Sequence, residues 1–149
     1  MTLNVSDLLR PFWVFTEQLA LLSPCKRHGV GCILIDENFR IRGWGYNRPR
    51  GYKTCSGEVG NCGCSHAEWF ACFTKDNEFN LPLLCLITLS PCQECLERLI
   101  SANVKAVLCL KVSRHGIIDN PNCPVEKWNA AFPERWNPNY DIFGITEFK

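Results

Sequence analysis

The sequence predicts an α/β fold with a mixed β-sheet, and two patterns carry that prediction. Residues 30–35 and 39–46 are apolar or alternating runs separated by a polar turn, which is typical of an antiparallel hairpin. Residues 83–88 and 105–110 are continuous apolar runs on either side of a helical segment, 92–102. A strand, helix, strand unit makes its two strands parallel, so antiparallel and parallel pairs are expected in one sheet.

Local signals predict the other elements in chain order. Residues 12–22 have the spacing of an amphipathic helix, which Ser23-Pro24 would end. Residues 47–64 are rich in glycine and cysteine, so a long irregular loop with a functional role is expected there. A short helix, 67–73, is expected to begin near His66.

The C-terminal part gives weaker signals, because prolines interrupt every regular pattern beyond Val112. We expect one helix at 125–131 and a last strand at 140–148. No internal repeat or low-complexity segment divides the chain, so residues 1–149 are predicted to form a single domain.

Composition argues against several classes of protein. The formal net charge of the 149 residues is +1, which argues against a dedicated duplex-DNA binder or a polybasic membrane binder. No apolar run approaches the roughly 20 residues that cross a bilayer, so no membrane partner is expected. Residues 1–10 lack the basic and apolar regions of a secretion signal.

Eleven cysteines are many for a chain of this size. A secreted disulfide scaffold is the first alternative, but the number is odd and the chain is large enough to fold without cross-links. Cys32, Cys85 and Cys109 lie in apolar runs, where a free thiol behaves as a small hydrophobic side chain. We therefore expect a cytoplasmic protein whose other cysteines are available for a metal.

Two short motifs carry the chemistry: His66-Ala67-Glu68 and, downstream, Pro91-Cys92-Gln93-Glu94-Cys95. Together they resemble the known signature of zinc-dependent nucleobase deaminases. Imidazole and thiolate are good ligands of Zn²⁺, and a catalytic zinc site keeps its fourth position open for water. His66, Cys92 and Cys95 are therefore the candidate ligands of one catalytic Zn²⁺, and Glu68 is the candidate proton shuttle.

Spacing constrains where these residues lie. Cys92 and Cys95 are three apart and share one face of a helix, whose N-terminus favours the thiolate form. His66 and Glu68 are two apart, so they converge only at the start of a helix. The cysteines alone would fit a structural zinc knuckle or a redox pair, but both motifs in this order, with a buried strand before the second, favour a catalytic site.

These motifs lie in a longer region, about residues 23–110, that resembles the deoxycytidylate (dCMP) deaminases of the cytidine deaminase superfamily. Residues 23–31 and Gly45-Tyr46-Asn47 match as well. The resemblance implies a three-layer α/β/α sandwich around a five-stranded mixed sheet, usually as a homo-oligomer. It implies zinc on His66, Cys92 and Cys95, and substrate beside Ala67 and Asn47. Asn47 has an equally plain explanation as a turn residue.

The chain departs from this family in several places. Phe70 stands where the family usually has Asn, and Arg48 stands where it often has Gly. The second position belongs to a region linked to regulation by deoxynucleoside triphosphates, so the sequence does not predict such regulation. Residues 111–116 lack the aspartate- and tyrosine-rich piece of the family, and that segment often contacts substrate.

The resemblance implies hydrolysis of dCMP, a small nucleotide, to dUMP and ammonia. The candidate phosphate ligands are Arg27, Arg48 and Arg114, with Lys26, Arg50 and Lys53 also in flanking loops. A charged side chain at any one of these positions is more commonly just solvated.

Two other functions remain open at this stage. A nucleic-acid deaminase, acting on tRNA adenosine or single-stranded cytidine, would explain the likeness of Asn47-Arg48-Pro49 to bacterial tRNA adenosine deaminases. Its bases would stack on aromatic side chains, for which the candidates are Trp69, Phe70, Trp128 and Trp136. A catalytically silent zinc module would keep the ligands but would have no use for Glu68.

A second, structural zinc is predicted at Cys25, Cys55, Cys62 and Cys64. These cysteines lie in loops that precede the His66 motif, outside the predicted strands and helices. The loop 47–64 has few apolar residues to order it, and four thiolates on one Zn²⁺ would do so. Phage-type dCMP deaminases resemble this in carrying an extra zinc near the equivalent loops.

Overall fold

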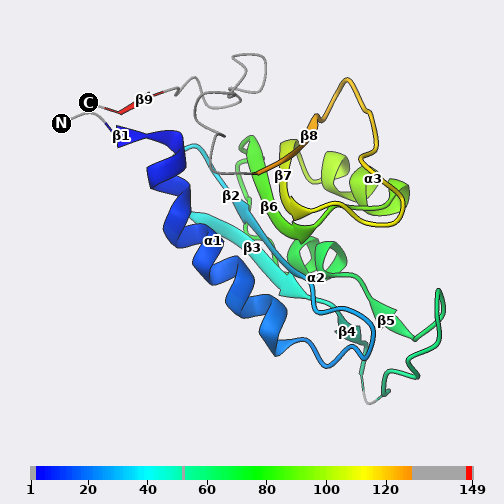
Figure 1. Ribbon diagram of the computed structural model, residues 1–149. Helices are drawn as coiled ribbons and strands as arrows, with labels where there is room; N and C mark the ends of the chain where they lie inside the picture. The colour runs from blue at the N-terminus through cyan, green and yellow to red at the C-terminus, as the bar shows by residue number, and fades with distance from the viewer. Residues whose placement is uncertain (1–2, 52, 129–146, 149) are drawn as a thin grey trace.

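A computed structural model describes residues 3–51, 53–128 and 147–148 (Figure 1). Its centre is a five-stranded sheet with the strand order β3-β2-β6-β7-β8. The strands are β2 (Gly31–Ile35), β3 (Ile41–Tyr46), β6 (Leu83–Leu89), β7 (Val104–Lys111) and β8 (Val125–Lys127).

Strand directions make this a mixed sheet, as predicted. β2 pairs antiparallel with both β3 and β6, so the hairpin prediction is confirmed. β6 and β7 run parallel, as the strand, helix, strand unit requires. β6 has partners on both sides, and its continuous apolar run reflects burial on both faces.

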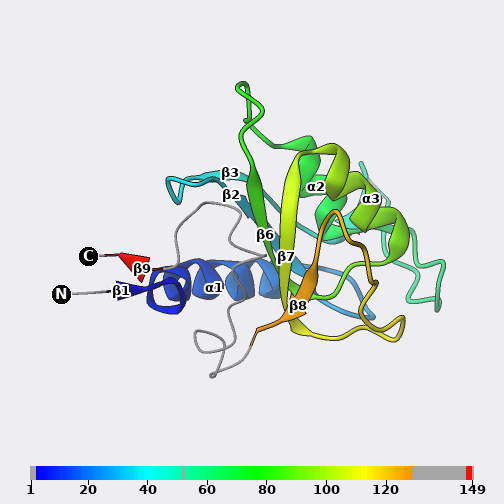
Figure 2. The same ribbon diagram turned by 90° about the horizontal axis from the view of Figure 1, so that it is seen from above.

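The helices form the two outer layers. Figures 1 and 2 show α1 (Val5–Leu22) on one face of the sheet, with α2 (Ala67–Phe73) and α3 (Gln93–Ser101) on the other. Alternate residues of β6 serve the two faces. Cys85 and Ile87 pack in the core with α2 and α3, whereas Leu84 and Leu86 pack in the core with α1. The three-layer α/β/α architecture is therefore confirmed.

The first helix is longer than the predicted segment 12–22, because it begins at Val5 and continues through Pro11. A proline inside a helix removes one backbone donor. Here the helix also buries Leu9 and Trp13 on the sheet, one before and one after the proline. This packing outweighs the local penalty.

Within the described residues, no helix combines the length and apolarity that a membrane crossing requires.

The predicted helix at 125–131 is wrong over its first part, where the chain forms β8 beside β7. Backbone hydrogen bonds join Val107 N–H to Pro124 C=O and Trp128 N–H to Cys109 C=O. Pairing with the open edge of β7 satisfies these backbone groups, and the local pattern of the segment did not contain that information. Residues 129–131 lie outside the described part of the chain.

Two further pairs of very short strands lie outside the main sheet. β4 (Arg48–Pro49) pairs with β5 (Cys64–Ser65), so the two ends of the predicted loop 47–64 meet. β1 (Leu3–Asn4) pairs with β9 (Glu147–Phe148), which is the described end of the strand predicted at 140–148. Residues 140–146 lie outside the described ranges.

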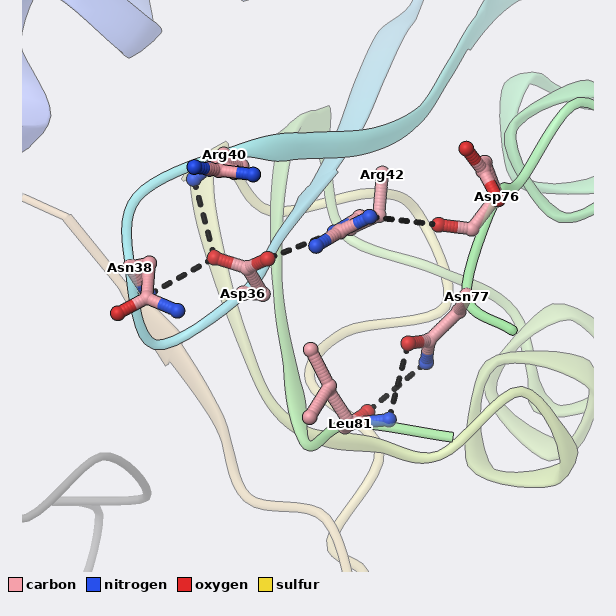
Figure 3. Close-up of polar contacts among 7 residues, drawn as sticks. All are labelled: Asp36, Asn38, Arg40, Arg42, Asp76, Asn77 and Leu81. Carbon is pink, nitrogen blue, oxygen red and sulfur yellow. Dashed lines mark hydrogen bonds and ion pairs between the residues drawn. The ribbon is translucent and has the colours of Figure 1, made fainter. Parts of the chain in front are cut away.

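A buried carboxylate closes the β2–β3 hairpin (Figure 3). Asp36 Oδ1 accepts hydrogen bonds from the backbone N–H groups of Asn38 (2.8 Å) and Arg40 (3.1 Å), and Oδ2 accepts one from Arg42 Nε (2.6 Å). Burial raises the pKa of Asp36, but these bonds together lower it below its ordinary value. Arg42 also reaches the carbonyl of Asp76, which ties the hairpin to the segment after α2.

Asp36→Ala should lower the free energy of unfolding by about 1–3 kcal/mol, because three partly buried hydrogen bonds lose their acceptor. The control is Arg10→Ala, which breaks the exposed pair of Asp7 and Arg10. That pair should contribute less than about 1 kcal/mol. Urea denaturation of the zinc-loaded protein compares the two variants, and equal losses would contradict the anchoring role of Asp36.

Candidate functional site

A cavity of about 680 Å³ opens where the parallel strands β6 and β7 end. Its wall includes Leu89 and Ser90, which end or follow β6, and Val112 and Ser113, which follow β7. Ligands of open α/β sheets commonly bind outside the carboxyl ends of parallel strands. The other walls come from the N-terminal ends of two helices and from the loops 25–30 and 60–65.

The two predicted motifs meet in this cavity. The ligand atoms of His66, Cys92 and Cys95 all lie within 4.8 Å of one another. His66 Nδ1 is 3.1 Å from Cys95 Sγ and 3.9 Å from Cys92 Sγ. One imidazole nitrogen and two thiols at this separation form a donor set that suits Zn²⁺.

The starts of α2 and α3 explain how residues far apart in sequence converge. His66 is the N-terminal cap of α2, and Cys92 is the N-terminal cap of α3. His66 and Glu68, two apart, therefore face the same cavity, because the backbone of His66 is extended and only Glu68 lies within the helix.

The thiols of Cys92 and Cys95 have pKa values shifted in opposite directions. A hydrogen bond from Cys95, aided by His66, lowers the pKa of Cys92 to about 3. The same contact raises the pKa of Cys95, and hydrogen bonding to Cys92 raises the pKa of His66. The pair thus favours one thiolate beside an imidazole, and a bound cation would favour the second thiolate as well.

Glu68 lies in the cavity wall and is 4% exposed. Burial raises the pKa of its carboxyl above the ordinary value, and this effect outweighs the lowering by His66 and by a hydrogen bond with Cys95. A raised pKa makes the carboxylate a better proton acceptor, and the protonated carboxyl group can then donate that proton. That property fits the proton-shuttle prediction.

Close packing against β3 fixes α2 in place. A Cβ atom at Gly45 would lie 2.6 Å from Phe70 Cβ and 2.8 Å from the carbonyl oxygen of Ala67. Only glycine leaves room for the helix to lie this close to the strand. Phe70 is buried there, in the position where a family asparagine was expected.

The structure also brings together the four cysteines of the second predicted metal site. Cys25, Cys55, Cys62 and Cys64 have sulfur atoms within 4.8 Å of one another. Cys25 Sγ lies 4.0 Å from Cys62 Sγ and 3.9 Å from Cys55 Sγ. A hydrogen bond from the backbone N–H of Lys26 contributes most to lowering the pKa of Cys55, to about 7.

Asn47 is a buried brace that also lines the cavity. Its Oδ1 accepts a hydrogen bond from Val30 N–H (2.8 Å), and its Nδ2 donates one to the carbonyl of His28 (2.6 Å). Its own carbonyl accepts a hydrogen bond from Ser23 Oγ (2.6 Å). The side chain therefore holds the loop that carries Cys25 through bonds to distant residues, and among the described residues it makes no local bond of the kind a turn asparagine makes.

The predicted phosphate ligands divide into two groups. Arg27 and Arg114 line the cavity, as does Ala67, whereas Arg48 does not. The guanidinium of Arg48 lies over the rings of Tyr46 and Phe70, 4.9 and 4.5 Å from their centroids. The two departures from the family at positions 48 and 70 are thus in contact with each other.

The cavity wall contains further basic residues. Arg50 lines it, although no sequence pattern distinguishes Arg50 from the other basic residues of its loop. His28 and His115 line it and were not among the predicted site residues. Their positions could have indicated this, because His28 lies in the family-matched residues 23–31 and His115 in residues 111–116, a segment that often contacts substrate. Glu68 is the one carboxylate among the described residues of this wall.

Asn47→Asp should lower the free energy of unfolding by about 1–3 kcal/mol without any substrate, because it replaces the amide donor to His28 by an oxygen. Asn122→Asp, at an exposed side chain, is the matched control and should change stability little. Thermal unfolding at constant zinc concentration measures both. An unchanged melting temperature in Asn47→Asp would mean that the brace contributes nothing.

Comparisons with known proteins agree with this site. The family described as the cytidine and deoxycytidylate deaminase zinc-binding region matches residues 13–111. A search of curated protein sequences finds no significant match.

Several solved structures share the fold. The dCMP deaminase of cyanophage S-TIM5 in complex with dCMP and dUMP is 28% identical, with a TM-score of 0.67, and the match covers 82% of this chain and 97% of that one. Its apo form gives 26% identity, a TM-score of 0.65, and coverage of 82% and 98%.

A more distant structure comes from a study of A-to-I editing by tRNA:A34 deaminases. It is 16% identical with a TM-score of 0.52, and the match covers 78% of this chain and 99% of that one. This likeness concerns the fold alone. The family match spans most of the chain and both metal-ligand motifs, so this protein belongs to the cytidine and deoxycytidylate deaminase family.

Proposed function

We propose that this protein is a zinc-dependent hydrolase that converts dCMP and water into dUMP and ammonia. The observation that carries the proposal is the convergence of His66, Cys92 and Cys95 beside the buried carboxyl of Glu68 in one cavity. The likeness to the cyanophage dCMP deaminase, which binds dCMP and dUMP, supports the choice of nucleotide.

His66, Cys92 and Cys95 would hold the catalytic zinc, since their donor atoms are of the right kind and already close together. When bound, zinc supplies Lewis-acid activation that makes water a nucleophile near neutral pH. The three side chains leave room on the cavity side, where Glu68 also lies.

Glu68 would move the protons of the reaction. Its carboxylate takes a proton from the attacking water and delivers it to the pyrimidine ring nitrogen, as the water oxygen bonds to the adjacent carbon. It then takes the remaining proton from the new hydroxyl group on that carbon and passes it to the departing amine, so that the carbonyl forms, the carbon–nitrogen bond breaks and ammonia leaves. Burial, which raises the pKa of Glu68, suits both directions of transfer.

The charge of the cavity favours an anionic substrate. Arg27, Arg50 and Arg114 line it, and Glu68 is the single carboxylate of its described wall. Arginine binds phosphate oxygens through paired, charge-assisted hydrogen bonds. We expect the phosphate of dCMP near these guanidinium groups and its ring near Ala67 and Glu68.

The nucleic-acid alternative has less support. Trp128 packs against Trp13 of α1, with ring centroids 5.6 Å apart, and Phe70 is buried, so both rings take part in packing. Trp136 lies outside the described residues. The formal net charge of +1 also does not favour a polynucleotide.

Cys25, Cys55, Cys62 and Cys64 would hold a second, structural zinc. Their four sulfur atoms match the ligand number of a closed structural site. Cys64 is two residues from His66, and three of the four cysteines, Cys25, Cys62 and Cys64, line the same cavity. The second metal would therefore order the wall that the substrate contacts.

Two broader expectations accompany the proposal. Six of the eleven cysteines lie in the two metal-binding clusters, which need reduced thiols, so we expect a reducing compartment such as the cytoplasm. Large apolar side chains are exposed on α1 and at the end of α2, including Leu21 (77%) and Phe73 (74%). These supply apolar surface for the homo-oligomer that the family resemblance implies.

The zinc-loaded protein should release ammonia from dCMP faster than from CMP, deoxycytidine, cytosine, single-stranded DNA or tRNA. Glu68→Gln should retain zinc yet lose at least about 100-fold in kcat, because general acid–base help contributes roughly 10²–10⁴-fold. Ammonia release and zinc content measure both effects. Near-normal turnover by Glu68→Gln would refute the shuttle, and activity on polynucleotide alone would favour the alternative.

Metal analysis of protein purified without chelator should find two zinc ions per chain. The double variant Cys62→Ser/Cys64→Ser should contain one, because the structural site loses two ligands while the catalytic set is intact. Cys109→Ser, at a buried cysteine in neither cluster, is the control and should keep two. One zinc in a fully active wild-type chain would contradict the structural site.

A further inference from the structure

Arg50 is held at the edge of the cavity by the backbone around it. It directly follows β4, which pairs with β5 so that Arg48 lies opposite Ser65 and Pro49 opposite Cys64. β5 leads at once to His66, a ligand candidate of the catalytic zinc. The β4–β5 pair therefore holds Arg50 near His66, and Arg50 lines the cavity.

A second contact orients the side chain. The guanidinium carbon of Arg50 lies 4.6 Å from the ring centroid of Trp69. Trp69 is itself held by two aromatic neighbours, stacked on Phe73 (5.2 Å, 7° between planes) and edge-on to Phe70 (4.9 Å, 84°). Trp69 is thus a fixed platform that follows Glu68 on the same helix.

This arrangement leaves the hydrogen-bonding edge of Arg50 for a ligand. An arginine that lies over an aromatic ring can still bind phosphate oxygens in pairs through its N–H groups. The ion pairs among the described residues join Arg42 to Asp36 and Arg10 to Asp7, so no carboxylate there neutralises Arg50.

Arg48 provides a natural comparison within two residues of the chain. It makes the same kind of contact, over Tyr46 and Phe70, and its Nη1 donates a hydrogen bond to the Tyr46 hydroxyl (3.0 Å). It does not line the cavity. Both arginines therefore lie over aromatic rings, but only Arg50 is also placed to contact a ligand in the cavity.

We infer that Arg50, held over the ring of Trp69, is a residue through which this site distinguishes a nucleoside monophosphate from the nucleoside. The inference rests on the proposed activity for its substrate class, and it makes Arg50 a substrate-binding residue and Trp69 a positioning residue. Preorientation lowers the entropy lost when the flexible arginine side chain binds phosphate.

The test compares kcat/KM for dCMP with kcat/KM for deoxycytidine in a set of variants. Arg50→Ala should lower the value for dCMP about 10- to 100-fold, mainly through KM, and leave deoxycytidine almost unchanged, as expected for a lost hydrogen bond to a charged group. Trp69→Leu should lower the dCMP value about 2- to 5-fold, the scale of an exposed cation–π contact, and Trp69→Phe should restore most of it.

Arg48→Ala is the matched control. Any effect it has on folding should change both substrates by the same factor, which leaves the discrimination ratio unaltered. Equal losses on both substrates in Arg50→Ala would overturn the inference, and equal losses in Trp69→Leu would overturn the positioning role. Zinc content and circular dichroism confirm that each variant is folded.

Binding of dUMP and deoxyuridine by calorimetry separates this inference from the proposed activity. Tighter binding of dUMP that depends on Arg50 would support the phosphate contact even if the protein failed to deaminate dCMP. Equal affinities of the wild type for the two ligands would overturn the inference, whatever the deaminase assay gives.

Discussion

The close approach of α2 to the sheet is the constraint on which the site depends. Gly45 lets the backbone of α2 lie against β3, where any side chain would collide with Phe70 and Ala67. That contact sets the position of His66 and Glu68 at the start of the helix. The start of α3 is set by the parallel pair β6 and β7, because α3 is the crossover helix between those strands. A metal-binding set forms where the two helix N-termini meet.

The two cysteine-containing clusters share a wall and therefore depend on each other. Cys64 belongs to the cysteine cluster and His66 to the histidine and cysteine cluster, with Ser65 between them. Asn47, which directly follows β3, lies in the same wall and holds the loop that carries Cys25. An ion in the cysteine cluster would thus limit the movement of residues that bind the catalytic ion and the substrate.

Much of this could be predicted from sequence because the decisive signals are local. The decisive segments are each continuous in the sequence: the apolar run of β6, the hairpin of β2 and β3, and the two metal-ligand motifs. β8 could not be predicted, because its strand state comes from pairing with the distant β7. The early start of α1 was missed for a similar reason, since burial on the sheet overrides the proline.

The basic residues of the loop were the least predictable part of the site. Arg48 and Arg50 are two residues apart and have the same side chain. Only the structure places Arg48 over the rings of Tyr46 and Phe70 and Arg50 in the cavity wall. Spacing cannot decide such cases, because the direction of each side chain depends on β4–β5 pairing and on Trp69.

The most direct test of the whole account is a zinc-edge anomalous difference map from crystals soaked with dCMP. The account predicts a strong anomalous peak bounded by His66, Cys92 and Cys95. In the electron density of the same crystals, it predicts the pyrimidine ring beside Glu68 and the phosphate against Arg50. A map with no peak at that position, or with the nucleotide bound away from the cavity, would contradict it.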